Sequence, residues 1–230
     1  DPTGRVLSSS EKLQLIEWAE QHNVTLIEYD RSELYFSGVR PATVASLVPE
    51  QSLCRVMTIA DFYDTISPTI SLGYLLCVNS FDECLFAKQT MAEEPSITLQ
   101  YMLQEMMSSG RYQRHVTQLR SQTKHNYTAA MALLRPHLAT LTHDQLYISQ
   151  PAGGPCLWFQ LPAYLSSQVL WQKMIANKLS IAPGGMFTLA ERYDNFFRVT
   201  YALPWNESMV EGIDKLGAII AEYVATEGNG

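Results

Sequence analysis

The sequence predicts an α/β fold, in which a mostly parallel sheet is followed by a smaller α+β unit. In the first part, one helix precedes short apolar segments that run without interruption, as is typical of strands covered on both faces. From Phe81 the apolar residues follow a helical period, and short strands return only from Leu146, between turns rich in Gly and Pro. We therefore divide the chain into a larger domain, residues 1–108, and a long helix with a small domain, residues 109–230.

The elements of the larger domain follow from local patterns. Ser8 and Glu11 match a capping box, so the first helix begins there and ends at the sequence QHN. Strands are predicted over 24–28, 55–59 and 70–78, and helices over 81–91 and 97–107 on either side of Pro95.

The smaller domain begins with a long amphipathic helix, residues 111–134, which we expect Pro136 to close. Short strands then alternate with two helices, the last of which starts at Glu207. The predicted strands are 146–149, 156–162, 179–183 and 195–203, and the predicted helices are 165–178 and 207–223.

The composition excludes several classes of function. With 16 Lys and Arg against 23 Asp and Glu, the net charge is −7, whereas nucleic-acid binding needs a basic surface. No apolar run approaches the ~18 residues that span a bilayer. The 4 cysteines form no CxxC pair, as expected for reduced thiols. We expect a cytoplasmic chain that contacts neither a membrane nor a nucleic acid.

The common catalytic motifs are absent from the sequence. It contains no Gly-rich phosphate loop, no HExxH or other metal-ligand spacing, and no GxSxG nucleophile turn. The 5 histidines are scattered over predicted helices and loops, so they indicate no metal site. The functional signal lies instead in the order of longer segments.

Seven segments follow one another over residues 1 to about 225. They read DPTG, LIEYDRSELYFSG, DFYDTISPTISLGYLL, SSGRYQRHVTQLRSQTKHNY, GGPCLWFQLP, IAPGGMF and FFRVTYA. Together they resemble the aminotransferase-like domain of the MocR group of GntR-type bacterial transcription regulators. The resemblance implies part of a fold type I aminotransferase large domain and a small C-terminal domain, with pyridoxal phosphate (PLP) between them. It also implies that residue 1 lies inside a longer polypeptide, after a winged helix-turn-helix DNA-binding domain.

The resemblance identifies the positions that would bind the cofactor. Asp64 stands where the family has the lysine that forms a Schiff base with PLP, and Ser71 replaces the arginine that holds the phosphate. Asp61 and Tyr63 fall where small hydroxyl residues contact the phosphate. The replacement at position 64 makes the charge of the pocket more negative by two units, and the replacement at position 71 by one more. A carboxylate also cannot form an imine. We therefore expect covalent PLP binding to be lost.

Other family positions are retained in part. Tyr29 occupies the place of the aspartate that pairs with the pyridine nitrogen, although a local shift would bring Asp30 there. Asp1 replaces an asparagine that donates a hydrogen bond to the cofactor ring, which an ionised carboxylate cannot do. Arg198 matches the arginine that binds the substrate carboxylate and offers a bidentate fork.

Three functions remain open. The first is a non-catalytic domain that forms homodimers and senses a small carboxylate or amino acid at Arg198. The second is a PLP-dependent aminotransferase or a PLP-using regulator whose amine comes from elsewhere, with Lys88 the nearest lysine in sequence. In the third, the ancestral site is empty and only the dimer interface is used.

Structural roles are open for the same residues. Asp64 would then cap a turn, and Arg198 would form an ion pair with Glu28 or Asp64.

A partial sheet would expose a strand edge and apolar surface, which predicts self-association. A group of aromatic residues is expected in the core: Phe187, Tyr193, Phe196 and Phe197.

Overall fold

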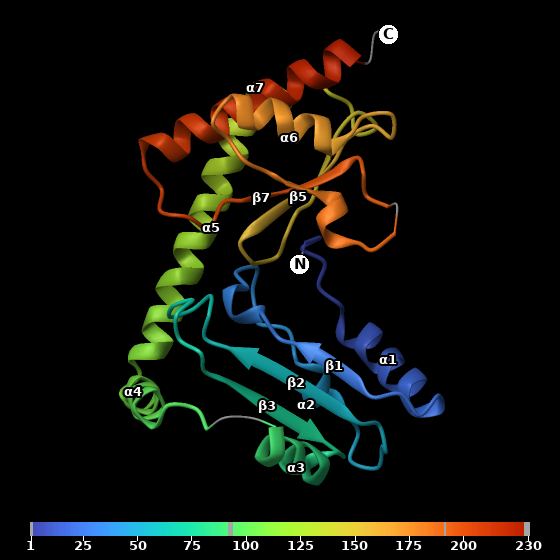
Figure 1. Cartoon of the computed structure of the whole chain (residues 1–230), viewed down its shortest axis with the longest axis vertical. Helices are drawn as coiled ribbons and strands as arrows, with labels where there is room; N and C mark the ends of the chain where they lie inside the picture. Colours follow the sequence, from blue (N-terminus) through green and yellow to red (C-terminus); the bar gives the residue numbers. More distant parts are fainter. Residues whose placement is uncertain (1, 92–93, 191, 228–230) are drawn as a thin grey trace. The chain divides into compact units, whose positions relative to one another are not determined.

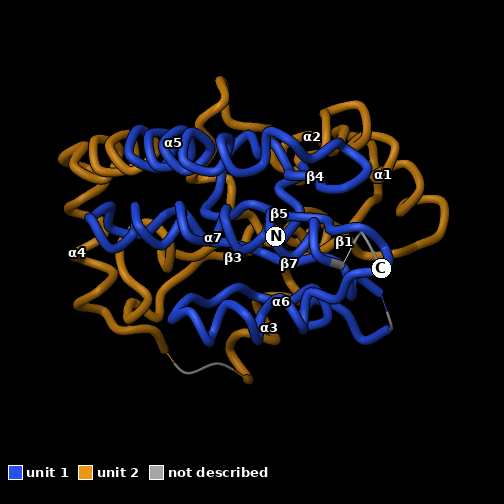
Figure 2. Tube along the Cα trace, turned by 90° about the horizontal axis from the view of Figure 1, so that it is seen from above, with its two compact units in different colours: residues 1–5, 121–230 blue, residues 6–120 orange. Residues whose placement is uncertain are grey.

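A computed structural model describes residues 2–91, 94–190 and 192–227 of the chain (Figure 1). The chain forms two compact units, residues 6–120 and residues 1–5 with 121–230, which are coloured separately in Figure 2. Helix α5, Arg111–Leu138, contributes residues to both. The division at residue 108 stays a prediction, and each unit is described below by itself.

The unit of residues 6–120 contains a three-stranded sheet with the order β1-β2-β3. Strand β1 is parallel to β2, whereas β3 is antiparallel to it. The connection from β2 to β3 contains no helix, as is usual between antiparallel neighbours, whereas parallel strands are usually joined through an α-helix. The elements are α1 Ser9–Gln21, β1 Leu26–Tyr29, the 3-10 turn η1 Ser32–Leu34, α2 Val44–Leu47, β2 Val56–Asp61, β3 Gly73–Val78, α3 Phe81–Met91 and α4 Ile97–Ser108.

One face of this sheet packs against α1 and α2. The capping box at the start of α1 is confirmed, because the Ser8 hydroxyl accepts from the Glu11 backbone N–H and the Glu11 carboxylate accepts from the Ser8 N–H. A helix fixed in this way presents Ile16 and Ala19 to Val56 in a small apolar core.

A partly buried polar network joins the same elements. Lys12 Nζ lies 3.2 Å from a Glu28 oxygen and 2.6 Å from the carbonyl oxygen of Ala42. The other Glu28 oxygen accepts from the Val44 N–H and from the Thr58 hydroxyl. Glu28 is therefore used to hold α1 and α2 on the sheet.

The opposite face of the sheet is apolar and exposed. Tyr29, Ile59 and Leu75 stand directly opposite one another in the register, and Ile27 precedes Tyr29 on the same face. Their exposed fractions run from 41% to 67%. We call these four residues the open sheet face. The expected exposure of apolar surface is thus observed.

The unit of residues 1–5 and 121–230 contains an antiparallel sheet with the order β4-β5-β7-β6. Figure 1 shows α6 and α7 on one side of β5 and β7. Besides the second part of α5, its elements are β4 Tyr147–Ile148, β5 Cys156–Gln160, α6 Ser167–Ala176, β6 Ala182–Pro183, the 3-10 turn η2 Gly184–Phe187, β7 Phe196–Thr200 and α7 Glu207–Glu227.

Strand alternation decides which side chains of this sheet enter the core. Phe159 and Phe197 stack with ring centres 4.6 Å apart and are buried with Leu157 and Val199 against the three helices. The alternate residues, including Trp158 and Arg198, lie on the other face. The main core of this unit therefore lies between the helices and one face of the sheet.

The expectation that Pro136 closes the long helix was wrong, since α5 continues to Leu138 with Pro136 inside it. A tertiary contact explains the last turn. His137 Nε2 lies 2.7 Å from Asp214 Oδ1 on α7, and the His137 ring occupies the space beside Gly217. These contacts hold the helix past the residue where local sequence alone would end it.

The aromatic group predicted for the core is divided between the two faces of the sheet. Phe197 belongs to the core, as expected. Phe187 and Phe196 instead pack around Trp158 on the other face, with ring centres 5.5 Å from it. Tyr193 joins them and is 42% exposed. Adjacent residues of a strand point to opposite faces, which separates Phe196 from Phe197.

Candidate functional site

The turn after β2 brings together several residues that the sequence selected. The Tyr29 hydroxyl donates to Asp61 Oδ2 at 2.5 Å, and the Tyr63 backbone N–H donates to Asp61 Oδ1 at 2.9 Å. The pKa of Tyr29 is raised above its usual value, mainly by the hydrogen bond to Asp61 and in second place by burial. Tyr29 therefore remains a neutral hydrogen-bond donor to this carboxylate.

Asp64 forms an ion pair with Arg31. Arg31 Nε and one terminal nitrogen lie 2.9 and 2.5 Å from the same Asp64 oxygen. Burial alone would lower the pKa of Arg31. The hydrogen bond to Asp64 and the charge of that residue outweigh burial, so the pKa of Arg31 lies above its usual value. The guanidinium also lies 5.8 Å from the ring centre of Tyr29. Asp64 thus occupies its position as the acidic partner of an arginine.

Sequence reasoning missed Arg31. Parallel strands place their carboxyl ends at the same edge of a sheet. Arg31 follows β1 and Asp64 follows β2, and these two strands are parallel neighbours. The strand predictions together with this rule could therefore have found the pair.

Asp30 points into a different network. Its carboxylate accepts from the Ser32 N–H and hydroxyl and pairs with Arg40, which also binds Glu33. Glu33 is in turn bound by Arg120 of α5. Burial would raise the pKa of Asp30, but the hydrogen bonds from Ser32 and the charge of Arg40 outweigh it and lower the pKa.

The remaining positions at this edge are exposed or undescribed. Ser71 and Tyr63 are exposed, and Ser71 precedes β3, whose first residue pairs with Asp61. Asp1 lies outside the described residues. The exposed Lys88 belongs to α3, which follows the other end of β3. No lysine occurs in the turn itself, residues 61–71.

Arg198 belongs to a second candidate site, which lies entirely in the unit of residues 1–5 and 121–230. It stands opposite Trp158 on β5 and opposite Ala182 on β6. The carbon of its guanidinium lies 4.9 Å from the ring centre of Phe187. Of the two acids considered as ion-pair partners for Arg198, Glu28 binds Lys12 and Asp64 binds Arg31.

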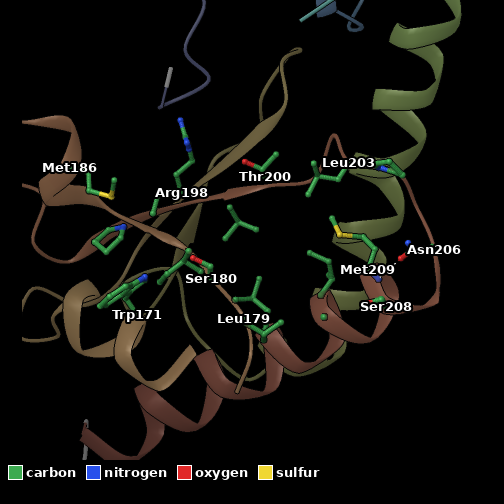
Figure 3. A pocket seen from close by; sticks show the side chains of 18 of the residues that line it. Trp171, Leu179, Ser180, Met186, Arg198, Thr200, Leu203, Asn206, Ser208 and Met209 are labelled. Carbon is green, nitrogen blue, oxygen red and sulfur yellow. Dashed lines mark hydrogen bonds between the residues drawn. The ribbon is translucent and has the colours of Figure 1, made fainter. Parts of the chain in front are cut away.

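A cavity of about 930 Å³ lies beside Arg198. Its lining comes from α6, from the segment that leads into β6, from β7 and from the first turns of α7. Figure 3 shows Arg198 at its rim, with Trp171, Leu179, Met209 and Leu203 around the cavity. Sequence reasoning selected Arg198 by resemblance but gave no indication of the cavity, because its walls are distant in sequence.

Other kinds of site find no support in the described part of the chain. No cluster of three His, Cys, Asp or Glu residues is arranged to hold a metal ion there. None of its helices is both long and apolar enough to cross a membrane.

Known proteins resemble this chain at the level of sequence. The HTH-type transcriptional regulator YdcR of Escherichia coli is 30% identical over 229 residues, which are 96% of this chain and 46% of the relative. The HTH-type transcriptional regulator NorG of Staphylococcus aureus is 25% identical over 219 residues, which are 94% of this chain and 47% of the relative. The chain spans about half the length of the curated relatives it matches. No family model matches it.

Solved structures share its fold. The α-aminoadipate aminotransferase LysN of Thermus thermophilus is 22% identical, with a TM-score of 0.85 over 97% of this chain and 57% of that one. A multiple substrate aminotransferase of Thermococcus profundus has 19% identity and a TM-score of 0.83, covering 97% and 54%. The chain therefore has the fold of the PLP-dependent, fold type I aminotransferases. Its relatives are HTH-type transcriptional regulators, so it is an aminotransferase-like domain related to regulators of this type, as the sequence predicted.

Proposed function

We propose that this chain is the effector-sensing and dimerisation domain of a transcriptional regulator and that it does not bind PLP covalently. The carrying observation is the ion pair between Asp64 and Arg31 at the position where the resemblance places the Schiff-base lysine. Regulatory relatives and an aminotransferase fold support the general role. The loss of the covalent bond is our inference from the chemistry of the turn.

The residues of this turn do not fit covalently bound PLP. Imine formation needs a nucleophilic amine, and the turn contributes the carboxylates Asp61 and Asp64 and no lysine. Arg31 compensates the charge of Asp64 through its ion pair. A carboxylate about 4 Å from a phosphate would still cost about 4 kcal/mol at an effective dielectric of 20. We therefore assign the turn no step in catalysis.

Arg198 supports the sensing role. Its guanidinium can bind a carboxylate through two parallel hydrogen bonds, and it borders a cavity large enough for a small molecule. Such a ligand would act on the regulator only if it bound one conformation more tightly than another. We propose a small carboxylate, amino acids included, as the effector.

The first experiment tests covalent cofactor binding. The chain is incubated with PLP, reduced with borohydride and mapped by mass spectrometry, in parallel with Asp64→Lys and the matched control Asp64→Asn. We expect an imine absorption band and a reduced adduct at position 64 only for Asp64→Lys. A stoichiometric adduct on any lysine of the wild-type chain, Lys88 above all, would favour the second candidate, a PLP-using domain.

The second experiment tests the carboxylate site. Thermal unfolding is measured with a panel of amino acids and other carboxylates, because a ligand that binds only the folded chain raises the midpoint. We expect at least one carboxylate to stabilise the wild type and to lose that effect in Arg198→Gln. A panel whose effects are the same in wild type and variant would reject the site and leave dimerisation as the role of the domain.

A further inference from the structure

We propose that the ligand of the Arg198 cavity is a monocarboxylate with a large apolar body, rather than a short or doubly charged acid. The inference rests on the proposed function, because it takes Arg198 as the carboxylate-binding residue. It adds the class of ligand, which follows from where the cavity lies and from what lines it.

The cavity lies beside the short strand β6. Strand β6 pairs with β7 only through Ala182 and Pro183, opposite Arg198 and Phe197. The next residues of β7, Val199 and Thr200, line the cavity on one side. The chain before β6 lines it as well, together with parts of α6 and α7. A volume of about 930 Å³ lies within the range of small-molecule sites, about 300–1,000 Å³.

The inner walls of the cavity are parts of the hydrophobic core. Ile181, Val199, Ile213 and Leu216 border it, and each is at most 7% exposed. An apolar group placed against such walls is removed from water, which contributes about 25 cal/mol for each Å² that it buries. The cavity therefore favours a ligand with a bulky apolar body.

The outer wall adds larger apolar side chains from separate elements. Trp171 of α6 and Met209 of α7 border the cavity, as does Leu203 of the segment between β7 and α7. A thioether side chain can adjust to ligands of different shape. The outer wall therefore limits the size of the ligand's apolar body and tolerates different shapes of it.

Charge restricts the ligand further. Among the described residues that line the cavity, Arg198 is the one with a charged side chain. The others that are polar are neutral, and the side-chain oxygen of Asn206 already accepts the Met209 N–H at 2.9 Å, which caps α7. A second carboxylate inside the cavity would therefore lose its water without gaining a counter-charge. Dicarboxylates are therefore expected to bind weakly.

The position of Arg198 orients the ligand. In Figure 3 the Arg198 side chain rises from the rim, and its head points away from Leu179 and Ser180. The guanidinium lies over the ring of Phe187 outside the cavity body. The carboxylate would thus bind at the mouth, where it stays partly hydrated, with the apolar body directed inward.

The test compares four probes by titration calorimetry on the whole chain. They are 3-phenylpropanoate, propanoate, glutarate and the uncharged 3-phenylpropanamide. We expect 3-phenylpropanoate to bind at least tenfold more tightly than each of the others and to lose at least tenfold in Arg198→Gln. The quenching of Trp171 fluorescence in the same titration reports occupation of the cavity, and Trp171→Phe assigns the signal.

A second variant tests the cavity itself. A Cβ at Gly212, which lines the cavity, meets only the Leu179 side chain, at 3.4 Å. Gly212→Leu is designed to occupy the cavity with a larger side chain, and Gly212→Ala is the matched control. We expect Gly212→Leu to weaken 3-phenylpropanoate at least tenfold and Gly212→Ala to change it less than threefold. Circular dichroism checks that both variants keep their helices.

The outcomes separate the two proposals. If propanoate and glutarate bind as tightly as 3-phenylpropanoate, and all depend on Arg198, the apolar ligand class is wrong and the carboxylate site stands. If Gly212→Leu binds 3-phenylpropanoate as tightly as the wild type does, the apolar ligand class is likewise wrong, and the carboxylate site still stands. If no probe depends on Arg198, or if the amide binds as tightly as the acid, the proposed carboxylate site fails.

Discussion

At the scale of single residues, the meaning of a side chain depends on partners that are far away in sequence. Asp64 is an unusual residue for an aminotransferase-like turn, yet the structure gives it an ordinary partner, Arg31, 33 positions earlier. Asp30 is likewise held by Ser32 and Arg40. These carboxylates are satisfied as structural acids, which favours a turn kept for its fold rather than for chemistry.

The first residue-scale prediction concerns pH. The folded chain holds Asp30 at a pKa below its usual value. At pH values between the folded-state and the unfolded-state pKa, the unfolded state therefore binds more protons than the folded state. The stabilisation is therefore present above about pH 4 and is lost as pH falls through the folded-state pKa. We expect Asp30→Asn to lower the free energy of unfolding by about 1–3 kcal/mol at pH 7 and by less at pH 3, measured by urea denaturation.

Ser71→Ala is the control for the pH prediction, since this exposed hydroxyl lies near the same edge of the sheet. Equal losses for Asp30→Asn at pH 7 and pH 3 would contradict the assigned role of the charge.

The second residue-scale prediction concerns a close backbone approach. A Cβ at Gly184 would lie 2.2 Å from the Tyr193 carbonyl oxygen, and Tyr193 already has a positive φ of 62°. The backbone would have to shift, which typically costs about 1–3 kcal/mol. We expect Gly184→Ala to lose that amount in thermal or denaturant unfolding. Gly185→Ala, where nothing lies within 4 Å of the added Cβ, should change stability by less than about 0.5 kcal/mol, and an equal loss would refute the explanation.

At the scale of elements, local signals predicted where helices begin better than where they end. The capping box starts α1 as predicted, whereas α5 passes Pro136 because His137 is held by Asp214 of α7. Strand β3 is antiparallel to β2, whereas β1 is parallel to it. The later end of α5 thus depends on a contact between elements that no local pattern contains.

The element-scale prediction concerns the start of α1. Ser8→Ala removes the hydroxyl that accepts from the Glu11 N–H, and N-cap substitutions of this kind cost about 1 kcal/mol. We expect that loss in chemical denaturation of the unit that contains α1. Ser9→Ala, one residue inside the helix, should be neutral or slightly stabilising, and a similar loss in both variants would argue against the capping role.

At the scale of the whole molecule, the apolar open sheet face has to be covered or will drive association. Ile27, Tyr29, Ile59 and Leu75 together form an exposed apolar surface across three strands. Strand β3 carries no charged residue and no proline, which are the features that protect exposed strands from pairing. The expectation of self-association therefore stays a prediction with a defined surface.

The whole-molecule prediction is a mass measurement. We expect the chain to form dimers or larger species at micromolar concentration by light scattering, and Leu75→Lys to shift the population toward the monomer. Leu189→Lys replaces a fully exposed leucine outside this face and should leave the distribution unchanged. A wild-type chain that stays monomeric under these conditions would contradict the prediction.

Part of this protein is determined by sequence alone. Capping residues, apolar periods and turn residues act within a few positions, so these local patterns place the strands and most helices correctly. The ordered segments also indicate the aminotransferase-like fold, which the solved structures share. Arg198 is selected in the same way.

Tertiary structure alone decided what surrounds these residues. The partner of Asp64, the network around Asp30 and the cavity beside Arg198 all join segments that are separated by tens of residues. Their geometry depends on strand register, helix packing and the length of β6, which are set by the burial of many side chains together. A local pattern shows which chemical groups are present, whereas only the packed chain brings them within bonding distance.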